Sequence, residues 1–373
     1  MRKRTLIPLL IAVLLLCALG VTLYLRAKAP PEAARLLPES DAIVYLNLKS
    51  IRSFTHFDQS PITRSPDFQH FIDATGIVPE RDLDSVALAL HRMPDPTGPN
   101  GPVAYSEVFI GRFDGTRLAH YLASIASSTD SYAGRTIYTI PVGEPVARTL
   151  RVAILSYDAI AASNMPTPEQ IHSMLDRFRA GALSTPGSSL LAARYHQVPI
   201  LSEAWGIGHI GLPFTDTDPT ATPPNGAPGF ISVLGLQLPL RTDTDFVASL
   251  RYTPAANVLS SGPVHLRGAV SLRIEEFAPD PSAAASTAET ITTLLAVLRG
   301  ISSEQAATQQ PPDPSTTAIT AILNSITLSH HDSIAVLNAT ASLDQLKALT
   351  TAHNPAASPL EPNPSAPSPA PTR

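Results

Sequence analysis

Cysteine is almost absent from this chain of 373 residues, because Cys17 is the only one. A single cysteine excludes disulfide bonds within the chain, so the fold has to be stabilised by its apolar core. Hydrophobic residues make up 44% of the sequence, which is ample material for one large domain or for two.

Basic residues are scarce beyond the first part of the chain. Residues 1–28 hold five of the 26 Lys and Arg residues and no acidic one, which leaves 21 basic against 31 acidic residues and a net charge of −10 for the remainder. A surface of that sign repels phosphate backbones, and its basic residues are scattered. The composition therefore argues against nucleic acid as a partner.

The common catalytic motifs are absent as well. The sequence contains no H-E-x-x-H zinc motif, no P-loop, and neither G-x-S-x-G nor S-x-x-K. We therefore predict no catalytic residue, no metal ligand and no cofactor, although an enzyme with dispersed residues is compatible with the sequence.

The chain does contain a long apolar segment at residues 5–25, which basic residues flank on both sides. At about 1.5 Å per residue, a helix of about twenty residues spans the hydrocarbon core of a bilayer, which is roughly 30 Å thick. We predict a transmembrane helix that contacts membrane lipid. A buried core helix does not fit, because the segment has no polar face.

Two alternatives to a permanent span concern processing of the chain. An Ala-x-Ala pattern at residues 27–29 resembles a signal-peptide cleavage site, but Pro30 would directly follow the cut. Lipid attachment at Cys17 would need a small residue before it, and Leu16 stands there. Both alternatives fit less well than an uncleaved signal anchor.

Basic residues indicate the orientation of the span. Arg2, Lys3 and Arg4 precede it, whereas Arg26 and Lys28 follow it. Because basic residues stay in excess on the cytoplasmic side, we predict a single-pass protein of the cell inner membrane with a cytoplasmic N-terminus. The bulk of the chain is then periplasmic or otherwise extracytoplasmic, and the reverse orientation is the alternative.

Composition predicts the domain boundaries. Residues 1–28 form a cytoplasmic stub and transmembrane helix, 29–35 a tether, 36–198 a first α+β unit, 199–353 a second α+β unit, and 354–373 a disordered tail rich in Pro, Ala and Ser. Three internal segments are expected to be loops: residues 94–102, 216–229 and 305–314.

Hydrophobic periodicity predicts alternating strands and helices. Residues 42–48 are apolar on both faces, which is typical of a central strand. Val264–Phe277 shows the clearest alternation in the sequence, as expected for an antiparallel strand with one wet face. Thr167 with Gln170, and Ser342 with Gln345, predict capping boxes at two helix starts.

Two parts of the chain resemble each other. The pattern Val108, Ile110, Phe113 recurs as Leu272, Ile274, Phe277, and residues 155–158 resemble residues 328–332. We predict the fold class α+β, with an N-terminal transmembrane helix followed by two related antiparallel-sheet-plus-helix units. Chance similarity between generic patterns is the alternative.

A pocket is predicted where the only tryptophan stands among alternating glycines. Trp205, Gly206, Gly208 and His209 are its candidate residues, because glycine lets a ligand approach the backbone closely. The same pattern fits a strand packed against the core, and G-x-G-x-x-G is not completed.

Two other clusters of ionisable residues have simple structural interpretations. His330 and His331 beside Asp332 suggest metal binding, but their place in the repeat predicts a solvated hairpin turn. Glu275 and Glu276 are neighbours on one strand, so they point to opposite faces and cannot act as a carboxylate pair.

Three segments carry a resemblance to known proteins: Leu36–Arg52 (LLPESDAIVYLNLKSIR), Asp73–Asp84 (DATGIVPERDLD) and His91–Asp114. Together they resemble uncharacterised bacterial single-span envelope proteins with a duplicated α+β ectodomain, a domain of unknown function. The resemblance implies topology and fold, and it assigns no functional residue.

These observations lead to two hypotheses of function. The first is a membrane-anchored protein with a non-catalytic binding or scaffolding role in the cell envelope, whose partner is another envelope protein. The second is an envelope hydrolase with its pocket near Trp205 and His209. A structural spacer is a third class.

Overall fold

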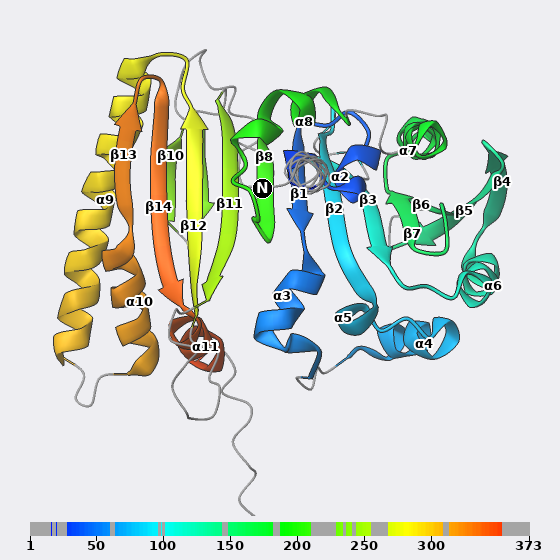
Figure 1. Cartoon of the computed structure of the whole chain (residues 1–373), viewed down its shortest axis with the longest axis horizontal. Coiled ribbons are helices and arrows are strands. Elements are labelled where there is room, and N and C mark those ends of the chain that lie inside the picture. The colour runs from blue at the N-terminus through cyan, green and yellow to red at the C-terminus, as the bar shows by residue number, and fades with distance from the viewer. Residues whose placement is uncertain are drawn as a thin grey trace, which may run out of the picture.

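A mixed α+β architecture built on one large antiparallel sheet is seen in the computed structural model (Figure 1). The structure describes residues 28–59, 64–95, 98, 101–143, 148–181, 187–209, 229–233, 236–240, 244–254, 268–308 and 313–352, and residues 16 and 20 singly. No helix in those ranges is long and apolar enough to cross a membrane. The tail predicted at 354–373 lies outside them, and so does the span predicted at residues 5–25 apart from residues 16 and 20.

Twelve strands of the described chain form the main sheet, and neighbouring strands pair antiparallel throughout. Their order across the sheet is β13 (Thr327–His331), β14 (Ile334–Ser342), β12 (Gly268–Phe277), β11 (Asp245–Pro254), β8 (Ala204–His209), β1 (Ala42–Leu46), β2 (Leu83–Arg92), β3 (Val103–Gly111), β7 (Ala159–Ser163), β6 (Arg148–Ile154), β5 (Arg135–Val142) and β4 (Ser128–Tyr132). A separate hairpin joins β9 (Gly229–Val233) to β10 (Leu236–Leu240).

The predicted central strand lies at the middle of this sheet. β1 pairs with β2 on one side and with β8 on the other, so its backbone is bonded along both edges. It ends at Leu46, because the next residue, Asn47, caps the helix α3 (Leu48–Thr55) by accepting a hydrogen bond from the Ser50 amide. The boundary predicted between residues 198 and 199 precedes β8, and the sheet continues across it.

One sheet face, here called the α2 face, carries the largest core cluster. Helices α2 (Glu32–Leu36), α7 (Glu169–Ala180) and α8 (Ser189–Arg194), with the 3₁₀ turn η2 (Tyr195–Gln197), cover it over the first half of the chain (Figure 1). Ile43 and Tyr45 of β1 and Ile207 of β8 are buried beneath these helices.

The opposite face, here called the α9 face, is covered by the remaining helices. In the first half these are α3, α4 (Pro66–Thr75), α5 (Pro79–Asp82) and α6 (Gly115–Ile125), with η1 (Phe57–Gln59) between α3 and α4; in the second half they are α9 (Pro281–Thr308), α10 (Pro314–Ser325) and α11 (Leu343–Ala352). Leu118 and Leu122 of α6 pack on Ile160, and Ala284 of α9 packs on Ala335.

The tether predicted at residues 29–35 is wrong for its second part. Residues 32–36 form α2, and Ala33, Ala34 and Leu36 are buried against the sheet together with Leu37. Small and aliphatic side chains on one side of a short helix give it an apolar face, which docks on the α2 face. The folded part of the protein therefore begins within the predicted tether.

Other local predictions have mixed outcomes. The capping box of α11 is confirmed, because the Gln345 amide donates to Ser342 Oγ and Gln345 Oε1 accepts from the Ser342 amide. The corresponding box for α7 is wrong: Pro168 occupies the N-cap position, and no side chain caps that helix start. Of the loop predicted at 305–314, residues 305–308 are helical instead, since α9 continues to Thr308.

Candidate functional site

The predicted tryptophan–glycine segment forms β8, between β1 and β11. The Trp205 side chain is only 3% exposed. Its ring stacks on Tyr45, its cross-strand partner, at 5.4 Å between centroids, and Tyr195 of η2 meets it edge-on at 5.3 Å. Such contacts are typical of aromatic packing in a core, so Trp205 joins the two halves of the sheet.

The two glycines of β8 differ in their surroundings. A Cβ atom placed on Gly208 would lie 2.5 Å from Cβ of Ala42 on the neighbouring strand, whereas a Cβ on Gly206 would meet nothing closer than 3.7 Å. Contacts near 2.5 Å are far inside van der Waals distance. Gly208 is therefore required by the close approach of β1, and this explanation needs no ligand.

His209, at the end of β8, belongs to a polar cluster that the sequence prediction did not contain. Its Nδ1 lies 2.6 Å from Oδ1 of Asp245, which is its cross-strand partner on β11. Arg194 of α8 donates from Nε and Nη2 to Oδ2 of Asp245 at 2.9 and 2.6 Å. The same guanidinium lies over the Phe277 ring of β12, 4.4 Å from its centroid.

Asp245 is the centre of this cluster, here called the Asp245 cluster. Each of its carboxylate oxygens is engaged by a different partner, and the three polar side chains are partly exposed. Such charge-assisted bonds hold groups in a defined geometry. The cluster ties α8 to three neighbouring strands, and its His–Asp pair has the arrangement that orients an imidazole for proton transfer.

The predicted residues are therefore separated by the sheet. Trp205 points to the α2 face and is enclosed, Gly206 and Gly208 carry no side chain, and only His209 reaches solvent. Of these residues His209 alone is available for chemistry. Arg194 carried no sequence signal, because it is one of many arginines in the chain.

A second polar group lies buried between β2, β3 and β7. His91 Nε2 is 3.0 Å from Ser106 Oγ, which is 3.0 Å from Ser163 Oγ, and all three side chains are buried. Burial lowers the pKa of His91, and the charge of Asp41 opposes this only partly. The chain of hydrogen bonds satisfies polar groups inside the sheet, and its burial leaves no access for a substrate.

The remaining candidates take the positions that their structural interpretations predicted. His331 and Asp332 form the exposed β13–β14 turn, where His331 Nε2 lies 3.1 Å from Asp332 Oδ2. Glu276 is buried and accepts a hydrogen bond from Thr244, whereas Glu275 points to the other face. No group of three or more potential metal ligands occurs in the described ranges.

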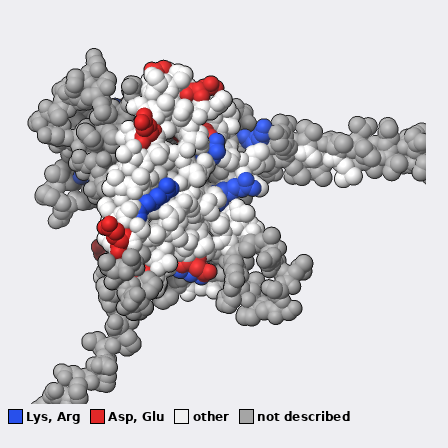
Figure 2. Space-filling view, turned by 90° about the vertical axis from the view of Figure 1, so that its left-hand side faces the viewer, with Lys and Arg blue, Asp and Glu red and all other residues white. Residues whose placement is uncertain are grey.

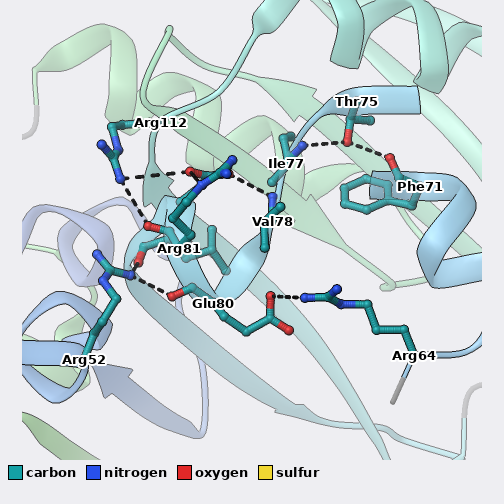
Figure 3. A network of polar contacts seen from close by, with 11 residues as sticks. Arg52, Arg64, Phe71, Thr75, Ile77, Val78, Glu80, Arg81 and Arg112 are labelled. Carbon is teal, nitrogen blue, oxygen red and sulfur yellow. Dashed lines mark hydrogen bonds and ion pairs between the residues drawn. The ribbon is translucent and has the colours of Figure 1, made fainter. Parts of the chain in front are cut away.

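A third polar network surrounds the short helix α5 (Figure 3). Arg52 of α3 donates to the carbonyl oxygens of Glu80 and Leu83 at 3.0 and 2.9 Å, and it pairs with Asp84 at 3.1 Å. Arg64 approaches the other side of α5 and pairs with Glu80 at 3.3 Å. These bonds attach α5 to the chain on both sides.

Asp82 completes this network from within α5. It accepts hydrogen bonds from the Arg81 side chain and from the Val78 amide, each at 2.8 Å. Arg112, directly after β3, donates to the Arg81 carbonyl. Partial burial raises the pKa of Asp82, but the bonds from Arg81 and Val78 outweigh it and lower that pKa overall. The network has a structural role, because its charges are used within the fold.

Comparisons with known proteins give only a distant likeness. No family model and no curated protein matches the chain. Among solved structures, crystal forms III, I and IV of a protein named TP0453 are similar, with TM-scores of 0.41, 0.38 and 0.40 and 10–11% sequence identity. The matches cover 87% of this chain and 98–99% of those chains.

Proposed function

We propose that this chain is a membrane-anchored extracytoplasmic protein with a non-catalytic binding or scaffolding role in the cell envelope. The observation that carries the proposal is a part of the main sheet that none of the described helices covers on one side. On β11, β12, β14 and β13 the α2 face has no described helix in front of it, as Figure 1 shows at the left. This part of the sheet is called the open face.

The open face is polar and regular. Arg251, Ser271 and Thr340 lie side by side on β11, β12 and β14, and the next row contains Arg273 and Asn338. Arg251, Arg273 and Thr340 are exposed. A wide antiparallel surface with donors and acceptors in register suits recognition of another polar surface, because each row can bond a matching group.

The end of the sheet beside the open face has few charges. Figure 2 shows the side at which β13 and α9 lie, and most of its visible surface is neither acidic nor basic. On α9, the large hydrophobic side chains of Val297 and Ile301 are exposed. A weakly charged flank next to a polar face favours binding to a partner over repulsion from it.

The proposal includes two related units that meet at β1 and β8. Outward from this pair the sheet order is β1, β2, β3, β7, β6 in one direction and β8, β11, β12, β14, β13 in the other. In the first unit α6 follows β3, and in the second α9 and α10 follow β12. Likewise, α7 follows β7 as α11 follows β14. The matching order supports duplication, and β4 with β5 is an addition to the first unit.

A site-specific crosslink tests the binding role. A photoreactive amino acid replaces Arg251 on the open face of the tagged full-length chain, and the matched control carries it at the exposed Glu289 of α9. After irradiation of cells, solubilised membranes are purified and analysed by mass spectrometry, with a chain cut after residue 35 as background.

Enrichment of one envelope component at position 251, but not at 289, is the expected result. Equal profiles from both positions, or only the background set, would contradict the proposed role of the open face.

A second candidate, an envelope hydrolase, is favoured by the His209–Asp245 pair. Their distance of 2.6 Å would hold the imidazole in one orientation, as a general base requires. His209→Ala would abolish turnover of an ester or peptide substrate in that case. In a binding protein, the same change would leave crosslinking at position 251 intact.

A further inference from the structure

The chain enters the fold on the α2 face. The hydroxyl of Tyr195 donates to the carbonyl oxygen of Ala29 at 3.3 Å, immediately before α2 docks on the sheet. This inference rests on the proposed function, in which a transmembrane span ends at residue 25. Four residues reach at most about 14 Å, so Ala29 and the Tyr195 that contacts it lie close to the bilayer.

The segment that follows Tyr195 exposes two large apolar side chains. Ile200 is 37% exposed and Leu201 is 72% exposed. Leu201 also has a backbone φ of 66°, in the left-handed region that a leucine rarely adopts. Such a conformation costs about 1–2 kcal/mol, and it persists only where the surroundings determine it.

The surroundings do hold this segment. Before it, Val198 packs against the core cluster of the α2 face, and its amide donates to the Tyr195 carbonyl. Ser202 Oγ donates to the Pro199 carbonyl at 2.7 Å, and the Glu203 amide donates to Leu250 of β11. Ile200 and Leu201 are therefore presented at the tip of a fixed turn.

We propose that Ile200 and Leu201 form a second membrane contact, inserted into the lipid interface beside the transmembrane span. Residue 201 is within about 20 Å of Tyr195 along the chain, and Tyr195 contacts the residue through which the anchor enters. The partner of this turn is lipid, because the short connection from the span to Ala29 and Tyr195 holds the turn near the bilayer. Burial of exposed apolar area in the interface is favourable.

Fluorescence of the full-length chain in vesicles tests the contact. Phosphatidylethanolamine and phosphatidylglycerol vesicles are prepared with and without a lipid that carries a quenching doxyl group. In a Cys17→Ser background, Leu201→Cys is labelled with a polarity-sensitive dye, and Tyr157→Cys is the matched control, because Tyr157 is 81% exposed at the β6–β7 turn. A third sample is the natural chain labelled at Cys17 within the predicted span.

The expected result is a blue shift and quenching by doxyl lipid at position 201, with neither at position 157. Quenching at Cys17 but not at 201 overturns the inference while the anchor stands, and a blue shift without quenching at 201 assigns that tip to a protein surface. Equal quenching at positions 157 and 201 would show general adsorption of the protein to the vesicles and would overturn the specific contact. If the dye on Cys17 is not quenched, residues 5–25 do not span the membrane, and the inference fails together with the proposed anchor.

Discussion

Gly206 and Gly208 provide a direct test of what the glycines of β8 are for. They lie on the same strand and face the same side of the sheet, two residues apart. A Cβ on Gly208 would lie 2.5 Å from Cβ and 2.9 Å from Cα of Ala42, and 3.1 Å from the Asp41 carbonyl. Backbone atoms of a central strand cannot move away cheaply, so Gly208→Ala forces β1 and β8 apart.

The magnitude follows from the cost of overpacking. Inserting a methyl group into a tightly packed core typically costs about 1–3 kcal/mol, and we expect that loss in the free energy of unfolding for Gly208→Ala. Gly206→Ala meets only ordinary contacts at 3.7 Å, and an alanine restricts the unfolded chain more than glycine does. We expect Gly206→Ala to be neutral or to stabilise by about 0.4–1 kcal/mol.

Denaturant titration of the full-length chain in detergent measures both effects. Trp205 is the only tryptophan and lies on the same strand as both glycines, so its fluorescence reports unfolding of this part of the sheet. Equal stability of the two variants would refute the steric argument. A loss of ligand binding without a loss of stability in both variants would instead favour the pocket that the sequence predicted.

Three further outcomes can be measured in the same way. Asp245→Asn should lower the free energy of unfolding by about 1 kcal/mol, because the partly exposed cluster loses its charge-assisted bonds to Arg194 and His209; an unchanged denaturation midpoint would contradict this. His91 has a folded-state pKa below its ordinary value of 6.5, so the unfolded chain takes up the proton first as the pH falls. Stability should therefore be complete above about pH 6.5 and fall below it by up to about 1.4 kcal/mol per pH unit, a slope that His91→Gln reduces. Leu201→Gly should raise the free energy of unfolding by up to about 1 kcal/mol by relieving the left-handed leucine, and a loss of stability would show that this side chain packs within the fold.

Patterns local to one element predicted the fold well. The alternation of β12 is confirmed, since Val270, Leu272 and Ile274 share one face and Arg273 is exposed on the other. The Ser342–Gln345 capping box is confirmed for the same reason, because it depends on residues three positions apart. The prediction of a mixed α+β fold with antiparallel sheets followed from such patterns.

Features that depend on distant partners were not predictable. β8 joins β1 across about 160 residues of sequence, and no periodicity within either strand specifies that pairing. The Asp245 cluster needs α8, β8, β11 and β12 to be placed first, so Arg194 could not be assigned from the sequence. The polar strand β4 was missed because its exposed residues carry no hydrophobic pattern.

The predicted tether shows that missing such distant contacts also affects conclusions about function. Residues 29–35 were predicted to be a spacer because so short a segment gives no usable period, yet Ala34 is fully buried on the sheet. Ala34→Asp would press a carboxylate against the α2 face, and we expect a loss of about 3 kcal/mol or more in the free energy of unfolding. Glu32→Ala, on the exposed side of α2, is the matched control and should be nearly neutral. Tryptophan fluorescence during denaturation measures both variants. A silent Ala34→Asp would mean that α2 is a spacer after all, so that Tyr195 and the turn after it need not lie close to the membrane.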